Sequence, residues 1–258
     1  MSTLLAARDP SPVTVTNPDS PAAVVLVVDH AGRRVPERLG DLGLPPAAFD
    51  RHIAWDIGIA AVSRRIAEAL GATLIEQTYS RLVIDCNRPP RVPGSIPVLS
   101  EATPIPGNEN LTDAARQARR GEIFDPYHAA IAGALDARAA RPTVLFAMHS
   151  FTPSYLGIAR PWHIGTLYGR DDRVARALGR LLEAEGDLVV GDNKPYEVTD
   201  DTDHTIPVHG EKRGLPHVGI EIRQDLIAHA AGQAEWADRM TRLLPLAAEK
   251  LLDQIKRS

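Results

Sequence analysis

The 258-residue sequence contains a single cysteine, Cys86, so no disulfide can form within the chain. This composition fits a protein of the reducing cytoplasm. The longest apolar run, residues 22–28, is far too short to span a bilayer, and residues 1–20 lack the pattern of a secretory signal. A formal net charge of -4 leaves no basic excess of the kind that nucleic-acid-binding proteins usually carry. We therefore expect a cytoplasmic protein whose partners are neither membranes nor nucleic acids.

Several motifs that identify common enzyme classes are also missing. The chain has no G-x-S-x-G elbow, although Ser150 follows His149, and no H-E-x-x-H, G-x-G-x-x-G or phosphate-binding P-loop motif. Cys86 lies between Asp85 and Asn87, with no histidine beside it that could activate a nucleophile. These absences argue against a serine or cysteine hydrolase and against a nucleotide-binding enzyme.

Periodicity along the chain predicts strands that alternate with helices. Valine-rich or otherwise apolar runs predict strands at residues 22–28, 73–75, 82–84, 143–148, 162–168 and 218–222. Helices are predicted at residues 57–70, 111–120, 126–139, 173–184 and 236–255, with a helical turn at 45–49. This alternation favours an α/β fold in which helices cover both faces of one sheet. We assign residues 21–258 to one catalytic domain, and residues 1–20, rich in Pro, Ser and Thr, to a flexible tail.

Two long loops interrupt this pattern. Residues 89–110 carry six prolines and no clear period, and residues 192–214 are mostly polar. Loops of this length inside a compact domain are often functional. We expect both loops to contact the substrate.

Ionisable side chains gather at the ends of the predicted strands. Asp29 and His30 follow the first strand, and His149 follows the strand at 143–148. Glu221 lies within the last strand, although burying a carboxylate there is costly unless it is paired. Because ligands of open α/β sheets collect at the carboxyl ends of strands, we expect these side chains to form one site.

This inventory matches the needs of a zinc hydrolase, which uses about three protein ligands and keeps one position open for water. His30 and His149 are the first two candidate ligands, because imidazole suits zinc. Asp56, at a predicted helix start, is our candidate for the third, although it could simply cap the helix. Asp29 and His52 compete for that role, and Asp29 could instead orient a ligating histidine.

The remaining candidates concern proton transfer and substrate binding. Glu221 is the candidate general base, with a salt bridge to Arg223 on the same strand face as the alternative. Arginine binds carboxylates through a two-pronged fork, and polar loop side chains can contact substrate or stabilise an oxyanion. The candidate substrate-binding residues are Arg81, Asn87, Arg88, Tyr196, His204, His209 and Arg223. His209 could also be considered as a metal ligand, but histidines at strand ends are held more rigidly.

These residues occur in an ordered set of short motifs that resembles the N-formylglutamate amidohydrolase family. Residues 28–150 contribute Val28-Asp-His30-Ala-Gly32, Trp55-Asp56-x-Gly58, Ser80-Arg81, Asp85-x-Asn87-Arg88 and His149-Ser150. Residues 164–225 contribute Ile164-Gly165-x-Leu-Tyr168, Asn193-x-Pro-Tyr196, His204-Thr-Ile, His209-Gly and Ile220-Glu-Ile-Arg-Gln-Asp225. Each motif is short, and their joint order across residues 24–227 makes the resemblance specific.

The resemblance implies a fold similar to that of the zinc carboxypeptidases and aspartoacylase, with a twisted mixed sheet and flanking helices. It also implies that His30 and His149 bind one zinc ion, that Glu221 activates water, and that Asn87 and Arg88 bind the substrate carboxylate. Carboxypeptidases carry an acidic ligand in an H-x-x-E motif, whereas Arg33 stands three residues after His30. The acidic ligand must therefore come from elsewhere, which is why we favour Asp56.

The resulting hypothesis is a zinc-dependent hydrolase that removes an N-formyl or other short N-acyl group from an acidic amino acid. Two alternatives stay open at this point. The enzyme could act on another N-acyl amino acid or a small peptide, or the chain could be a non-catalytic module that binds a small molecule.

Overall fold

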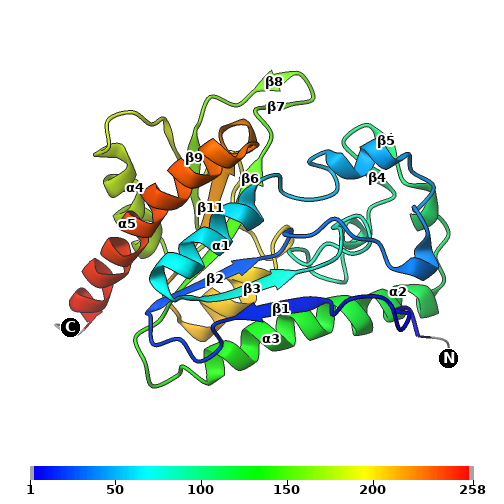
Figure 1. The fold of residues 1–258 in the computed structure, drawn as a ribbon, viewed down its shortest axis with the longest axis horizontal. Helices are drawn as coiled ribbons and strands as arrows, with labels where there is room; N and C mark the ends of the chain where they lie inside the picture. Colours follow the sequence, from blue (N-terminus) through cyan, green and yellow to red (C-terminus); the bar gives the residue numbers. More distant parts are fainter. Residues whose placement is uncertain (1–2, 256–258) are drawn as a thin grey trace.

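The computed structural model describes residues 3–255 and contains a seven-stranded mixed sheet at its centre (Figure 1). The strand order is β1-β3-β2-β6-β11-β9-β10. The strands are β1 (Val13–Thr16), β2 (Val24–Val28), β3 (Thr73–Gln77), β6 (Val144–Phe151), β9 (Ile164–Leu167), β10 (Val190–Asp192) and β11 (His217–Arg223). The central run from β3 to β11 is parallel, whereas β1 and β9 lie antiparallel to their neighbours β3 and β11.

Helices cover both faces of this sheet, as predicted. The helices α1 (Ile59–Leu70), α4 (Arg173–Glu183) and α5 (Ala230–Ile255) pack together on one face. The helix α3 (Asp125–Asp136) packs on the opposite face, beneath β1 and β3 (Figure 1). Two apolar cores result, one on each side of the sheet, and every residue of β2 and β6 is buried between them. Burial on both faces explains why these strands read as continuous apolar runs.

Shorter elements decorate the edges of the sheet. Two small hairpins stand outside it, β4 (Leu99–Ser100) with β5 (Thr103–Pro104), and β7 (Ser154–Tyr155) with β8 (Ile158–Ala159). Short helical turns are η1 (Glu37–Leu39), η2 (Pro46–Asp50), η3 (Pro93–Ser95), η4 (Pro106–Asn108), η6 (Ile206–Gly210), η7 (Glu211–Arg213) and η8 (Gln224–Leu226). Within residues 3–255, no helix has both the length and the apolar character needed to cross a membrane.

The N-terminal segment differs from the flexible tail that we predicted. Val13–Thr16 forms the edge strand β1, which pairs with β3. Leu4 is buried, and the backbone N–H groups of Leu4 and Leu5 donate to the carboxylate of Glu122. Pairing of β1 with β3 and the hydrogen bonds to Glu122 therefore hold a segment whose composition alone indicates disorder.

Two further predictions need correction. Residues 82–84 form a buried turn rather than a strand, because the Val83 N–H donates to the carbonyl of Ser80 instead of to a neighbouring strand. The predicted break between residues 120 and 126 is absent: α2 (Asp113–Arg119) continues through a π-helical turn, η5 (Arg120–Phe124), into α3. Pro126 falls in the first turn of α3, where proline is tolerated.

Candidate metal and active site

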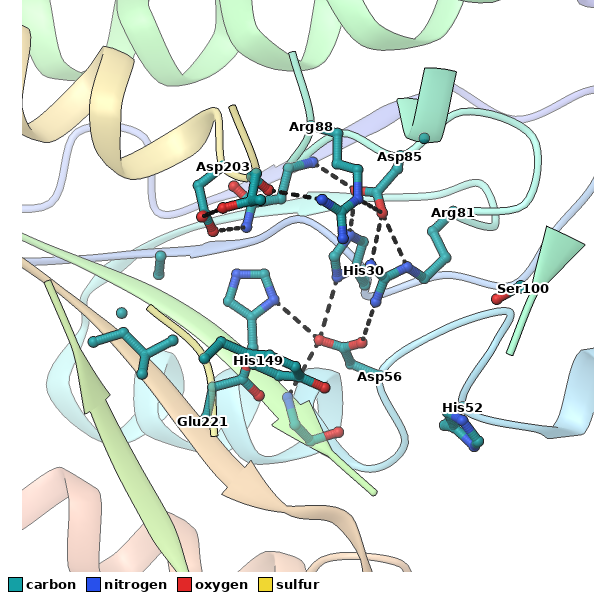
Figure 2. A pocket seen from close by; sticks show the side chains of 18 of the residues that line it. His30, His52, Asp56, Arg81, Asp85, Arg88, Ser100, His149, Asp203 and Glu221 are labelled. Atoms are coloured by element: carbon teal, nitrogen blue, oxygen red, sulfur yellow. Dashed lines mark hydrogen bonds and ion pairs between the residues drawn. The ribbon is translucent and has the colours of Figure 1, made fainter. Parts of the chain in front are cut away.

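Three neighbouring strands bring the candidate residues to one edge of the sheet. His30 follows β2, His149 lies in β6 and Glu221 lies in β11. The register of β6 and β11 places His149 directly beside Glu221, so both side chains project from the same face. Figure 2 shows both side chains pointing into a common space together with His30 and Asp56. The convergence expected at the carboxyl edge of the sheet is therefore present.

Backbone contacts hold the two loops that supply His30 and Asp56 against each other. The Asp56 N–H donates to the carbonyl of His30 over 3.0 Å. Two residues further on, a side chain at Gly32 would place its Cβ 1.9 Å from the carbonyl oxygen of Thr78. Only glycine fits this close approach of two backbones. The small residues that follow His30 thus allow its loop to pack closely beside the segment after β3.

His30, Asp56 and His149 form a compact group whose ligand atoms all lie within 4.8 Å of one another. The Asp56 Oδ2 atom lies 3.3 Å from Nδ1 of His30 and 3.0 Å from Nδ1 of His149. All three residues are buried. Two imidazole nitrogens and a carboxylate oxygen are the donor set of many zinc sites. These three residues could therefore hold a metal ion, and the third member of the group is Asp56 rather than Asp29 or His52.

Each imidazole also faces a second carboxylate through its other nitrogen. Nε2 of His30 lies 2.7 Å from Oδ1 of Asp85, and Nε2 of His149 lies 3.1 Å from Oδ2 of Asp29. A neutral imidazole carries only one N–H, so it cannot donate to carboxylates on both sides. Protonation would let His30 donate to both of its carboxylate neighbours, whereas His149 makes its hydrogen bond to Asp56 through Nδ1 and its Nε2 atom has no hydrogen-bond partner among the described residues. Burial lowers the pKa of each imidazole, but the adjoining carboxylates outweigh it and raise the pKa of both His30 and His149.

One divalent cation carries the same charge as the two protons that would make both imidazoles positive, so a metal ion could replace those protons. Arg81 together with two protonated imidazoles would balance the carboxylates of Asp29, Asp56 and Asp85. One divalent cation with two neutral rings gives the same balance. His30, Asp56 and His149 would hold the cation, and the carboxylates of Asp85 and Asp29 would lie beside the two imidazoles, as is usual for metal-binding histidines. The residues present fit a divalent metal such as zinc.

Arg81 links two of these carboxylates. Its Nη2 atom lies 2.6 Å from Oδ2 of Asp85, and its Nη1 atom lies 3.3 Å from Oδ1 of Asp56. Burial raises the pKa of the Asp85 carboxyl, but Arg81 and His30 outweigh it and hold that pKa well below its usual range. Asp85 is therefore charged across the physiological range and can orient His30.

Glu221 differs from Asp29, Asp56 and Asp85 because it forms no ion pair with any described side chain. Its side chain is only 7% exposed, and its Oε2 atom has no hydrogen-bond partner among the described residues. Burial raises the pKa of Glu221 to about 7. The alternative salt bridge with Arg223 does not form, because Arg223 pairs with Asp225 instead. Glu221 thus has the pKa and the free oxygen that a general base requires.

A cavity of about 510 Å³ opens beside these residues. It is lined by Asp56, His149 and Glu221, and also by four of the predicted substrate-binding residues: Arg81, Asn87, Arg88 and Tyr196. Parts of both long loops form its walls, as does Tyr155 from the hairpin β7–β8. The cavity is the size of an ordinary small-molecule site.

Asn87 reaches the cavity, but its amide already has protein partners. Its Oδ1 atom accepts from the N–H groups of His204 and Thr205, and its Nδ2 atom donates to Asp203 over 3.2 Å. Arg88 also contacts this loop, through a hydrogen bond from Nη1 to the carbonyl of Thr202. Both side chains therefore position the second long loop, and their contact with a substrate carboxylate stays a prediction.

The structure does not bring the other three predicted substrate-binding residues to the cavity. His209 is buried against His128, with 3.0 Å between Nε2 of His209 and Nδ1 of His128. His204 packs against the other face of this cluster, 4.5 Å from the His128 ring centroid. Arg223 donates to Asp225 and to two backbone carbonyls. None of these three side chains lines the cavity.

Our sequence reasoning missed the roles of Asp85, Asp203 and Tyr155. Asp85 lies in the Asp85-x-Asn87-Arg88 motif, and a carboxylate so near a candidate anion binder was a signal that it orients another residue. Asp203 and Tyr155 belong to irregular or hairpin segments that line the cavity. No spacing in the sequence connects those segments to the strand ends.

Fold and site together define an amidohydrolase built on a mixed α/β sheet. The chain belongs to the N-formylglutamate amidohydrolase family, whose model matches residues 22–228. The resemblance inferred from the ordered motifs is thereby confirmed.

Two solved structures are similar to this chain over nearly its whole length. A gene product from Agrobacterium tumefaciens is 40% identical, with a TM-score of 0.90 over 98% of this chain and 99% of that chain. An N-formylglutamate amidohydrolase from Ralstonia eutropha is 21% identical, with a TM-score of 0.64 over 96% of this chain and 99% of that chain. The second likeness shows a shared fold. None of the curated proteins matches this chain.

Proposed function

We propose that this chain hydrolyses the amide bond of an N-formyl or other short N-acyl derivative of an acidic amino acid, such as N-formyl-L-glutamate. The observation that carries the proposal is the convergence of His30, Asp56 and His149 beside the buried carboxylate of Glu221. Membership of the family supports the same reaction.

His30, Asp56 and His149 would hold one zinc ion. Bound zinc would act as a Lewis acid, which polarises a carbonyl group and makes water more acidic. Glu221 takes a proton from the attacking water and later delivers it to the leaving amine, since its buried carboxylate lies directly beside His149 and has an oxygen without a hydrogen-bond partner among the described residues. Arg81 lies close enough to the ligand group to stabilise negative charge on the carbonyl oxygen, and Arg88 binds the α-carboxylate. The products are formate, or another short acid, and a free amino acid.

Metal removal and a single substitution test this proposal together. The zinc-loaded protein is assayed on N-formyl-L-glutamate, N-formyl-L-glutamine and an N-acetyl amino acid, before and after chelation. We expect turnover to vanish on chelation and to return with zinc. Glu221→Gln should retain zinc but lose at least about 1,000-fold in kcat, because it removes the group that transfers protons. Glu183→Gln, an exposed change on α4, serves as the control.

The outcomes separate the alternatives. Full activity of metal-free protein would refute the role of zinc, and wild-type turnover by Glu221→Gln would refute the role of the glutamate. Turnover of the N-acetyl amino acid alone, without turnover of either N-formyl compound, would identify a different N-acyl amino acid as the substrate. Zinc binding without turnover of any compound would favour a non-catalytic binding module.

A further inference from the structure

Arg160 differs from the other arginines near the cavity in having no acidic partner. Arg81 pairs with Asp56 and Asp85, and Nε of Arg88 lies 3.8 Å from Asp85. No carboxylate among the described side chains forms an ion pair with Arg160, whose side chain makes a single hydrogen bond, to the hydroxyl of Tyr196 at 2.8 Å. A guanidinium group has five N–H donors, so most of its donors have no protein acceptor.

Two tyrosine rings that line the cavity hold this guanidinium group, although Arg160 itself is not one of the lining residues. Its central carbon lies 5.0 Å from the ring centroid of Tyr155 and 4.8 Å from that of Tyr196. Both rings line the cavity, although Tyr155 comes from β7 and Tyr196 from the second long loop. The Arg160 N–H also donates to the carbonyl of Pro153, which closes the base of the hairpin β7–β8.

This arrangement fixes a cation without neutralising it. Stacking on aromatic faces restrains the plane of a guanidinium group and leaves its edge available for an anion. Among the described residues that line the cavity, the two arginines, Arg81 and Arg88, already lie beside carboxylates. A substrate with a second negative charge would therefore meet its strongest unmatched positive charge at Arg160.

We propose that Arg160 binds the side-chain carboxylate of the substrate and so selects acidic N-acyl amino acids over neutral ones. This inference rests on the proposed function, which it extends by assigning the residue that recognises the acidic side chain. The α-carboxylate and the amide bond lie deeper, near Arg88 and the ligand group, and the side-chain carboxylate extends toward the hairpin β7–β8.

The alternative is a purely structural role, in which Arg160 only ties the hairpin β7–β8 to the loop that carries Tyr196. The two roles differ in one measurable quantity. A structural tie would affect an acidic substrate and its neutral isostere equally. A selective anion contact affects the acidic substrate alone.

The test compares N-formyl-L-glutamate with N-formyl-L-glutamine, which has nearly the same shape and lacks the second charge. For Arg160→Gln we expect KM for the glutamate derivative to rise about 10- to 100-fold, the effect of losing a hydrogen bond between charged groups. KM for the glutamine derivative and kcat for both should change less than about threefold. Arg160→Lys keeps the charge without the planar fork and should fall between wild type and Arg160→Gln.

Arg176→Gln is the matched control. Arg176 also stacks on a tyrosine, 5.1 Å from the Tyr168 ring centroid, and donates to its hydroxyl at 2.7 Å, but Tyr168 does not line the cavity, whereas Tyr155 and Tyr196 do. This variant should leave the preference for glutamate over glutamine unchanged. An equal loss on both substrates in Arg160→Gln, or no change in their ratio, would overturn the inference and leave the proposed function standing. A wild-type protein inactive on both compounds would overturn both.

Discussion

Each of the two imidazoles at the centre of the site lies between two carboxylates. Asp85 and Asp29 face the Nε2 atoms of His30 and His149, so both Nδ1 atoms point toward Asp56. A carboxylate that receives the second N–H of a ligating histidine also makes its other nitrogen a better donor to the metal. The positions of these aspartates would therefore determine which nitrogens face a metal bound to the group.

Removing one orienting carboxylate should weaken the metal site without removing a ligand. We expect Asp85→Asn to lower zinc affinity about 10- to 100-fold, because His30 loses the charge that fixes its orientation. Competition with a chromophoric chelator measures the change. Asp203→Asn is a suitable control, because Asp203 lines the same cavity and bonds to Asn87 rather than to an imidazole. Equal affinities for Asp85→Asn and wild type would contradict this account.

At the scale of elements, a buried histidine cluster joins α3 to the turn η6. His128 lies between the rings of His209 and His204, and its Nε2 atom lies 2.8 Å from the carbonyl oxygen of Cys86. His128 of α3 thus contacts the second long loop through the rings of His204 and His209. Charging any of these rings would place a cation in a site that already excludes water.

Stability should therefore fall as this cluster is exposed to acid. Burial, reinforced by the neighbouring His209, lowers the pKa of His128 to about 4, and Asp29 offsets this only in part. The unfolded chain has a pKa near 6.5 at this residue and binds more protons, so lowering the pH from 7 to 5 favours unfolding. For His128 alone the loss between pH 7 and pH 5 is about 2 kcal/mol, and stability continues to fall until the pH is below about 4.

The variant His128→Gln removes the titrating ring and can keep a hydrogen bond to the Cys86 carbonyl. We expect the loss of unfolding free energy between pH 7 and pH 5, measured by urea denaturation, to shrink by about 2 kcal/mol. His229→Gln changes an exposed histidine and should keep the wild-type pH dependence. An unchanged pH dependence in His128→Gln would show that the ring does not resist protonation.

Sequence reasoning succeeded for elements whose burial dictates their composition. The valine run of β2 and the apolar run of β6 are buried on both faces, so they could be identified, and the histidines at their ends followed. The edge strand β1 was missed because its mostly exposed residues give no pattern of burial. Residues 82–84 were misassigned because burial in a turn and burial in a strand leave the same apolar signal.

The limits at the site have a similar cause. His204 and His209 lie in a polar loop, and nothing in their spacing shows that this loop folds back onto α3. Arg160 was not among the predicted residues, because its proposed role in binding an anion depends on two tyrosine rings from separate segments of the chain. Ligands on strands are fixed by register, whereas contacts between loops depend on tertiary packing that local sequence does not encode.

At the scale of the whole molecule, the cavity and the larger apolar core lie at different places on the sheet. The cavity opens at the carboxyl edge, while α1, α4 and α5 cover one face with an apolar core that does not line the cavity (Figure 1). The long helix α5 contacts both α1 and α4, so it closes this face as a unit. Stability and chemistry should therefore respond separately to changes in α5.

Two leucines of α5, on either side of Pro245, allow this separation to be tested. Leu244 is fully buried in the apolar core, whereas Leu246 is 41% exposed. Leu244→Ala should lower the free energy of unfolding by about 2 to 5 kcal/mol, through lost transfer energy and the cavity left behind. Leu246→Ala should lower the free energy of unfolding by less than about 1 kcal/mol.

Well below the unfolding temperature, kcat and bound zinc should match wild type in both variants, because neither side chain lines the cavity. Equal losses of stability in the two variants would show that α5 does not pack as described, and a fall in kcat for folded Leu244→Ala would show that this face of the sheet is coupled to the site.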